Sequence, residues 1–312
     1  MLTVLHDIAE LTALERPVVL AIGVFDGVHR GHQLVIQQAQ ARARERGAVM
    51  VLMTFDPHPM RVLRPGTAPK LLCTAEHQQL ILARQGVTHL LLCEFNETVA
   101  KTSAEDFVRS LAAACRKLDA VFVGETWRFG AKRAGDIELL QRLGSDLAFE
   151  AFGVKPLTVD DKVISSTLIR EAVERGDFVA AKQLLGRDYT VLGTVIAGRK
   201  LARQLGFPTA NLDVHNEQLP PAGVYAVRAL IGETGYPGVA NLGRRPTVAD
   251  TDDLSLEVHV FDFDTDLYGQ LVEVTFVQHL RNEKKFAGLD ELKAQIGEDA
   301  VKARLALSYS AT

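Results

Sequence analysis

The stretch VVLAIGVFDGVHRGH at residues 18–32 decides the fold of the first half of the chain. Its apolar run, Val18 to Ile22, is followed by two glycines and an Asp and then by a polar, helix-forming segment. A buried strand that turns through glycines into a helix is the building unit of parallel α/β sheets. Such sheets bind ligands at this turn, because close backbone amides and the helix N-terminus attract an oxyanion.

The rest of the first half continues this alternation of apolar runs and amphipathic stretches. Strands are predicted at residues 49–54, 90–93 and 121–123, and helices at 33–46, 76–85 and 104–117. This order is typical of a parallel, Rossmann-like sheet with crossover helices. Two short helices, 167–175 and 178–185, follow and are closed by Gly186, so we predict a first domain over residues 1–185.

The second half has a different pattern. Strand-like segments rich in Val, Tyr and Phe occur at 191–196, 224–230, 238–242, 256–261 and 271–277, separated by Gly, Pro and Asp turns. Their spacing predicts a small antiparallel β-barrel. Helical periodicity returns at 289–307, with Asp290 as the expected N-cap, so the second domain, 186–312, should end in a covering helix.

Composition and charge exclude several classes of protein. The chain has 312 residues, more than one hydrophobic core usually holds, and this length favours two domains. A net charge of -4 provides no positive field for nucleic acid, so we expect no nucleic-acid partner. The longest apolar run is too short to span a membrane and no secretion signal is evident, so we expect a cytoplasmic protein without a membrane partner. The three cysteines are expected to be reduced core thiols.

Three motifs of the first half carry groups that suit a nucleotide ligand. His29 and His32 can face one side of the first helical turn and donate to a phosphate. The hydroxyls of 165–167, with Arg170 one turn later, are also phosphate donors, and the loop 54–59 holds an aromatic, a histidine and two prolines that suit a rigid ligand wall. Each motif alone also fits an ordinary explanation: a tight turn, a helix cap with a solvated Arg, and a stiffened turn.

The second half contains two candidate sites. In GFPTAN, residues 206–211, Thr209 and Asn211 offer oxygen ligands on one face of an extended chain, which suits Mg²⁺. The alternative is a proline turn whose Asn bonds its own backbone. Glu257 lies in an alternating strand and can act as a general base, or can simply face solvent.

Taken together, these motifs resemble the bacterial bifunctional riboflavin kinase and FAD synthetase family. The first half carries the HxGH and ISSTxIR signatures of that family at 29–32 and 164–170. In the second half the matching segments are 206–211, 221–225, 238–243, 245–247, 257–259, 266–269 and 281–286. The chain departs from the family at four positions: Thr126 and Trp127 replace an Asp-Phe pair, Asp56 stands for Glu and Ala202 for Gly.

The resemblance implies a Rossmann-like nucleotidyltransferase domain of the α/β class, followed by a small antiparallel β-barrel kinase domain with a C-terminal helix. It also implies two reactions: ATP phosphorylates riboflavin to FMN, and FMN then attacks the α-phosphorus of ATP to give FAD and pyrophosphate. Mg²⁺ is the implied cofactor, and riboflavin, FMN, FAD and ATP are the implied partners.

Roles for individual residues follow from the same resemblance. Catalysis falls to Glu257, the base for the riboflavin hydroxyl, and to His29, His32 and Arg170 in adenylyl transfer. The resemblance implies that ATP phosphates are bound by Gly23, Phe25, Asp26, Gly27, Gly31, Ser165, Ser166, Thr167, Gly198, Arg203 and Gly206; flavins by Phe55, Pro57, His58, Pro59, Arg128, Phe129, Arg281 and Phe286; and Mg²⁺ by Thr209 and Asn211.

Two other functions remain open from the sequence. HxGH with ISSTxIR also occurs in transferases that adenylylate other mononucleotides, although the attached kinase motifs argue against this. A flavin-binding regulator without catalysis would fit the departures at Thr126, Trp127 and Ala202, whereas the intact His29 and Glu257 argue against it.

Overall fold

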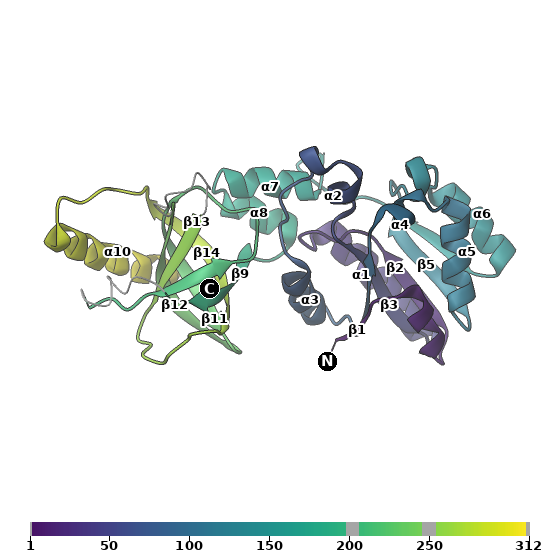
Figure 1. Ribbon diagram of the computed structural model, residues 1–312, viewed down its shortest axis with the longest axis horizontal. Coiled ribbons are helices and arrows are strands. Elements are labelled where there is room, and N and C mark those ends of the chain that lie inside the picture. The colour runs from purple at the N-terminus through teal and green to yellow at the C-terminus, as the bar shows by residue number, and fades with distance from the viewer. Residues whose placement is uncertain (1, 198–205, 245–253, 310–312) are drawn as a thin grey trace. The chain divides into compact units, whose positions relative to one another are not determined.

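The computed structural model describes residues 2–197, 206–244 and 254–309. The chain forms two compact units, Met1–Lys70 with Ala75–Ser166, and Leu71–Thr74 with Thr167–Thr312. Figure 1 shows a sheet with helices in the first unit and a barrel with a long helix in the second. The predicted architecture is therefore confirmed for both halves of the chain.

The first unit is built on a six-stranded parallel sheet in the order β1-β4-β3-β2-β5-β6. The strands are β1 (Thr3–Leu5), β2 (Val18–Ile22), β3 (Val49–Asp56), β4 (His89–Glu94), β5 (Leu118–Gly124) and β6 (Glu150–Val154). Every residue of the central β2 is buried, as expected for a strand covered on both faces. The sheet order reverses at β2, so the loop after this strand lies at the switch point where such sheets bind ligands.

Helices cover both faces of this sheet (Figure 1). They are α1 (Arg30–Arg46), α2 (Pro59–Leu63), α3 (Ala75–Arg84), α4 (Glu97–Lys101), α5 (Ala104–Ala114) and α6 (Ile137–Leu147), with 3₁₀ turns at Ile8–Ala13, Pro65–Thr67 and Ala131–Arg133. The main core packs Leu20 and Met53 of the sheet against Leu111 of α5 and Leu143 of α6. All three cysteines are buried and free, which confirms the predicted core thiols.

The second unit is a closed antiparallel barrel with strand order β10-β13-β12-β11-β14-β9. Its strands are β9 (Thr190–Ile196), β10 (Ala210–Val214), β11 (Gly223–Ile231), β12 (Thr234–Arg244), β13 (Leu254–Val260) and β14 (Leu271–Arg281). The helix α10 (Leu289–Tyr309) covers part of it, packing Ala303 and Leu307 against Val224 and Phe261. Because α10 begins at Leu289, Asp290 lies in the first helical turn and not at the predicted N-cap.

Residues before 186 also pack with the barrel. The helices α7 (Ser166–Glu174) and α8 (Phe178–Leu185) precede it, and Gly186 ends α8 in a left-handed conformation, as predicted. The ring of Phe178 stacks on Phe276, with centroids 5.7 Å apart. The segment Leu71–Thr74 joins the same unit, where the Leu72 carbonyl accepts a 2.6 Å hydrogen bond from the Asn216 amide.

Across the described residues, the structure contains no helix that combines the length and the apolar character needed to cross a bilayer.

Candidate active sites

The loop after β2 has an unusual backbone. Phe25, Gly27 and Val28 all have positive φ angles, of 52°, 77° and 43°. A β-branched residue such as Val28 rarely adopts this conformation, and burial of the Phe25 and Val28 side chains holds the loop in place. Successive backbone amides in such a loop converge on one point and form an anion-binding concavity.

Polar side chains of neighbouring elements hold this loop in place by hydrogen bonds to its carbonyl groups. The Thr54 hydroxyl of β3 and the Gln78 amide of α3 both donate to the Val24 carbonyl, at 2.8 and 3.1 Å. The Ser166 hydroxyl donates to the Asp26 carbonyl at 2.9 Å, which joins the start of ISSTLIR to the loop. Gln78 was not predicted as a site residue, because it lies in another element and only the fold brings it to the loop. Thr54 begins the predicted ligand wall 54–59, but its contact with the Val24 carbonyl was not predicted.

The two histidines of HRGH stack on each other. Their ring centroids are 3.5 Å apart, which confirms that they face the same side of the helix start. His29 caps α1 by accepting a hydrogen bond from the His32 backbone amide at 3.3 Å. A Cβ at Gly31 would lie 3.1 Å from the His29 ring, so a glycine there leaves room for the stack.

Burial decides the ionisation of His32. Loss of solvent, and then the neighbouring His29, lower the pKa of His32 well below its ordinary value. Its Nδ1 atom is buried and lacks a hydrogen-bond partner within the described part of the chain. At neutral pH the ring is therefore uncharged and can donate one hydrogen bond to a phosphate oxygen.

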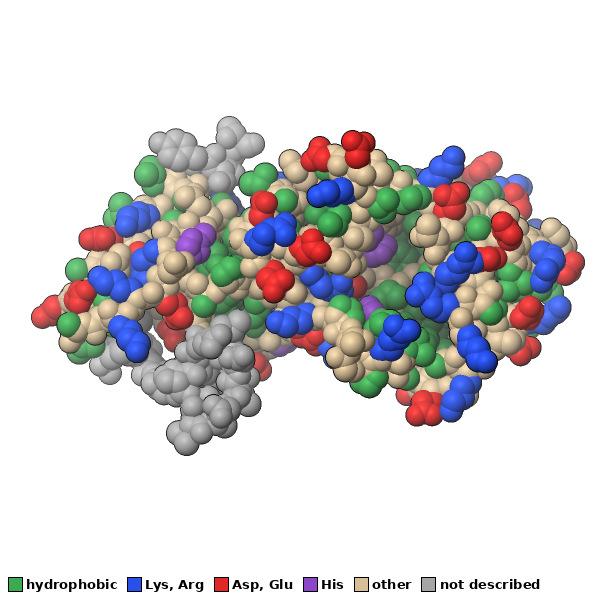
Figure 2. All heavy atoms as spheres, turned by 90° about the horizontal axis from the view of Figure 1, so that it is seen from above, with side chains coloured by type: hydrophobic (Ala, Val, Ile, Leu, Met, Phe, Trp, Pro, Cys, Tyr) green, Lys and Arg blue, Asp and Glu red, His purple; other side chains and the backbone are tan. Residues whose placement is uncertain are grey.

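Other predicted residues of the first site are less closely connected to this loop. Thr167 and Arg170 lie on α7 in the second unit, so their part in phosphate binding stays a prediction. His58 caps α2, accepting from the Met60 amide at 3.1 Å, and Pro59 is the first residue of that helix. Figure 2 shows a hollow with hydrophobic and histidine side chains, bordered by Lys and Arg.

The structure places Phe129 in the core of the first unit. Its side chain is 6% exposed and packs against Phe107, while Trp127 stacks on it with centroids 4.6 Å apart. Arg128 forms an ion pair with Asp136. The flavin contact predicted for Phe129 stays a prediction, and the half-buried Trp127 is the ring of this pair that is nearer to solvent.

A cavity of about 330 Å³ lies between the barrel and α10. Its lining residues come from five strands, from the residue before β10, from the segment after β14 and from α10: Thr209, Asn211, Val224, Val239, Ala240, Asn241, Glu257, His259, Arg281, Glu283, Lys284, Phe286, Leu292, Ile296 and Asp299. Of the six residues predicted for the kinase site that the structure describes, five line this cavity, namely Thr209, Asn211, Glu257, Arg281 and Phe286, whereas Gly206 does not. Gly206 lies in a turn with φ +92°, whereas Gly198 and Arg203 lie outside the described residues.

Strand register brings the polar side chains of this cavity together. Glu257 of β13 pairs with Asn211 of β10 on one side and with Asn241 of β12 on the other. Cross-strand partners point to the same face, so the carboxylate lies between two amides. The His259 ring bonds the Pro208 carbonyl at 2.8 Å and fixes the segment that carries Thr209. Asn241 was missed as a site residue because only the register reveals its position.

Part of the cavity lining is apolar and aromatic. Phe286, Leu292 and Ile296 contribute to it, and the Arg281 guanidinium lies 5.7 Å from the centroid of the Phe286 ring. The cavity thus combines oxygen ligands and a carboxylate with apolar side chains that suit a planar ring system.

Comparisons with known proteins identify the family of each half of the chain. The family model of FAD synthetase matches residues 11–168 and that of riboflavin kinase matches residues 185–307. A bifunctional riboflavin kinase/FMN adenylyltransferase of Escherichia coli is 38% identical over 96% of this chain and 95% of its own length. The protein of the same description from Pseudomonas fluorescens is 40% identical over 95% of each chain.

A solved structure shares the fold. It is described as a macrolide-efflux protein from Streptococcus pneumoniae, is 29% identical, and superposes with a TM-score of 0.80 over 94% of this chain and 96% of its own. The signatures, the two folds and the near full-length relatives lead to one assignment. The chain belongs to the family of bifunctional riboflavin kinases/FMN adenylyltransferases.

Proposed function

We propose that the chain converts riboflavin to FMN and FMN to FAD, with ATP as the donor in both steps. The barrel of the second domain carries out the first reaction, and the parallel sheet of the first domain carries out the second. The observation that carries this proposal is the register that sets Glu257 between Asn211 and Asn241 in the cavity between the barrel and α10.

In the kinase reaction, Glu257 removes the proton from the 5′-hydroxyl of riboflavin as this oxygen attacks the γ-phosphorus of ATP, and ADP leaves with the β,γ-bridging oxygen. A hydroxyl is a poor nucleophile near pH 7, and a positioned base typically accelerates such a step by about 10² to 10⁴. Arg281 and Phe286 border the ring system of the flavin in the cavity. Gly198, Arg203 and Gly206 are proposed to contact the phosphates of this ATP.

The oxygen atoms of Thr209 and Asn211 fit a magnesium ion, because hard cations prefer oxygen ligands. These two residues would hold Mg²⁺ in the kinase site. When bound, the ion neutralises charge on the phosphates of ATP.

In the adenylyl transfer, the FMN phosphate attacks the α-phosphorus of ATP and pyrophosphate leaves. This nucleophile is already ionised near pH 7, so the site needs alignment and charge neutralisation and no base. The loop with Gly23, Phe25, Asp26, Gly27 and Gly31, the uncharged His32, and His29 provide donors on one side of the first helical turn. Ser165, Ser166, Thr167 and Arg170 are proposed to add donors, and Phe55, Pro57, His58, Pro59, Arg128 and Phe129 to contact FMN.

We also propose that the two activities divide between residues 1–185 and 186–312, with α7 and α8 packing beside the kinase barrel, and that the protein acts in the cytoplasm. The activities can be tested in one reaction. The protein is incubated with riboflavin, ATP and Mg²⁺, and the flavins are separated by chromatography over time. FMN should form first and FAD later, with pyrophosphate released only in the second step.

A chelator control should stop both steps. Riboflavin that is bound but unchanged would instead indicate a flavin-binding regulator. Conversion of a different mononucleotide in preference to FMN would overturn the assignment of the first domain.

A further inference from the structure

One buried carboxylate of the kinase cavity has no role in the chemistry above. Asp299 of α10 is only 3% exposed and lines the cavity. Its carboxylate accepts hydrogen bonds from both Nε and Nη2 of Arg281, at 2.9 and 2.7 Å, and from the Gln295 amide at 3.1 Å. An arginine bound at two nitrogen atoms by one carboxylate is fixed in orientation as well as in place.

Arg281 in turn contacts two groups after β14, the Asn282 carbonyl and the Phe286 ring. Its Nη1 atom donates to the Asn282 carbonyl at 2.9 Å, so all three nitrogen atoms of the guanidinium are engaged. The guanidinium lies 5.7 Å from the centroid of the Phe286 ring. Asn282 and its next three neighbours in the sequence are exposed, and Lys284 of this stretch lies 5.4 Å from the centroid of the Phe286 ring and pairs with Glu291 at 2.9 Å.

Burying an ion pair contributes little net stability, because desolvation of both charges offsets their attraction. The main effect of the pair between Arg281 and Asp299 is therefore to fix the orientation of the guanidinium. Arg281, which Asp299 orients, and Phe286 both line the same cavity as Glu257, Thr209 and Asn211.

We propose that Asp299, supported by Gln295, is a positioning residue for the flavin: it holds Arg281, and through it Phe286, in the orientation that binds the ring system of riboflavin. This inference rests on the proposed kinase function of the cavity. It assigns to α10 a part in substrate affinity in addition to covering the barrel.

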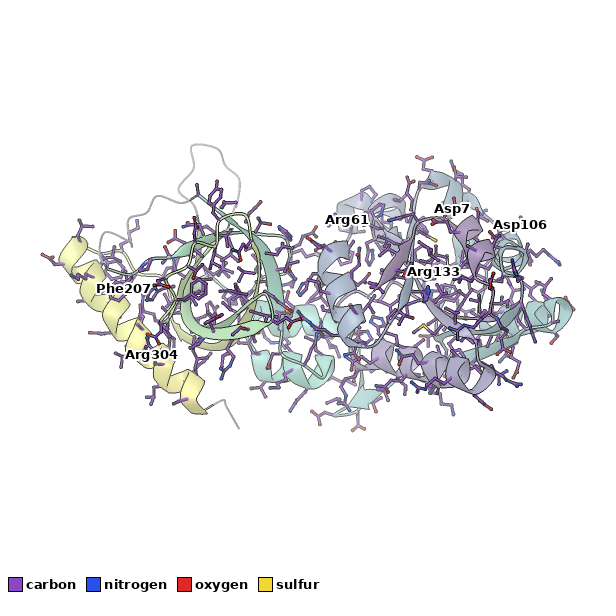
Figure 3. All side chains as sticks on the ribbon, turned by 90° about the horizontal axis from the view of Figure 1, so that it is seen from below. Asp7, Arg61, Asp106, Arg133, Phe207 and Arg304 are labelled. Carbon is purple, nitrogen blue, oxygen red and sulfur yellow. The ribbon has the colours of Figure 1, made fainter. Side chains whose placement is uncertain are left out.

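The same helix offers a matched control. Arg304 of α10 forms a two-point ion pair with Asp262, at 2.8 and 2.9 Å, and lies 4.3 Å from the centroid of the Phe261 ring (Figure 3). The chemistry of this clamp is that of the first, but Arg304 and Asp262 are 50% and 75% exposed and do not line the cavity. A general effect of losing an Arg–Asp–Phe clamp on α10 would appear in both variants.

The test compares Asp299→Asn with Asp262→Asn in the full-length protein. Asp299→Asn keeps the size of the side chain but removes the charge, and its NH₂ group faces the donors of Arg281. The KM for riboflavin should rise about tenfold or more, as for the loss of a charge-assisted hydrogen bond. The kcat and the KM for ATP should stay within about twofold to threefold, because Glu257, Thr209 and Asn211 are intact. Asp262→Asn should leave all three constants unchanged.

A double-variant cycle tests whether Asp299 acts through Arg281. In an Arg281→Gln background, Asp299→Asn should raise the riboflavin KM no further. If Asp299→Asn does not fold, Gln295→Ala, which leaves the ion pair intact, replaces it and should raise the riboflavin KM by about twofold to fivefold.

The affinity for riboflavin without ATP is measured by flavin fluorescence. This measurement tests the role of Asp299 even if the wild-type protein shows no kinase activity. Absence of kinase activity would contradict the proposed function but not the role of Asp299. An unchanged riboflavin affinity in folded Asp299→Asn would overturn the inference. So would a loss confined to kcat, or an undiminished effect in the Arg281→Gln background.

Discussion

The packing of α8 against the barrel predicts how the kinase domain can be isolated. A fragment that starts at residue 186 keeps every strand of the barrel but loses α7 and α8, whereas a fragment of residues 167–312 keeps nearly all of both helices. Both fragments lack Leu71–Thr74, so the comparison isolates the contribution of the two helices. We expect only the longer fragment to fold stably and to phosphorylate riboflavin at a rate close to that of the full chain.

The expected difference in stability follows from buried apolar surface. Leu185 is fully buried, Leu184 is 8% exposed, and Phe178 stacks on Phe276. Each such side chain contributes about 1.5 to 3 kcal/mol when buried, so removing the three costs about 4.5 to 9 kcal/mol, as an upper estimate. Whole domains are stable by about 5 to 15 kcal/mol, so this loss is a large fraction of the total.

Thermal unfolding of the two purified fragments provides the assay. The fragment 186–312 should unfold at a temperature lower by about 10 °C or more, or should already be unfolded in the cold. Riboflavin kinase activity is measured on both, and neither should make FAD. Equal unfolding temperatures and equal activities would refute the reasoning, because α8 would then contribute nothing to the barrel.

Other predictions concern single side chains. Glu257→Gln should lower the kcat of riboflavin phosphorylation by about a hundredfold or more while FAD synthesis from supplied FMN continues; activity within a few-fold of wild type would exclude Glu257 as the base. His29→Ala should abolish FAD formation and leave FMN formation intact, and equal loss of both would contradict the division of activities. Changing Thr126 to Asp together with Trp127 to Phe should alter the KM for FMN more than that for ATP, and an unchanged KM for FMN would mean that this loop does not contact the flavin. The lowered pKa of His32 means that the unfolded chain binds its proton first, so the free energy of unfolding should fall as the pH drops below about 6.5. The free energy of unfolding, measured by urea titration at several pH values, should fall less in His32→Asn than in the wild type. An equal fall with pH in both proteins would assign the pH dependence to other groups.

The sequence allowed the architecture to be predicted because the long elements have clear periodicity. It failed for short or irregular ones. β1 has three residues, and β6 contains a glycine and is only partly buried, so neither shows a period. The helix α6 did carry a signal that was overlooked: Asp136 caps it by accepting from the Leu139 amide at 3.0 Å, and apolar residues follow at helical spacing.

The candidate sites were predictable to the extent that their residues lie in contiguous motifs. HRGH and GFPTAN could be recognised because spacing along the chain sets their geometry. Asn241 and Asp299 could not, because closure of the barrel and the position of α10 bring them to the cavity from distant parts of the sequence. Phe129 shows what a contiguous motif leaves open: its ring packs against Phe107 in the core, and its contact with the flavin stays a prediction.

The two sites differ in the groups they provide because the two nucleophiles differ in protonation. On the proposed assignment, the first reaction starts from a neutral hydroxyl, which requires a base, and the barrel provides the carboxylate of Glu257 held in register between two amides. The second starts from a phosphate that is already charged and needs no base. The loop after β2 provides backbone amides and the uncharged ring of His32 as hydrogen-bond donors that stabilise negative charge, and the carboxylate of Asp26 in this loop is buried. The two sites therefore differ in structure, with a strained backbone at one and regular strand pairing at the other, because the attacking oxygen carries a proton in the first reaction and none in the second.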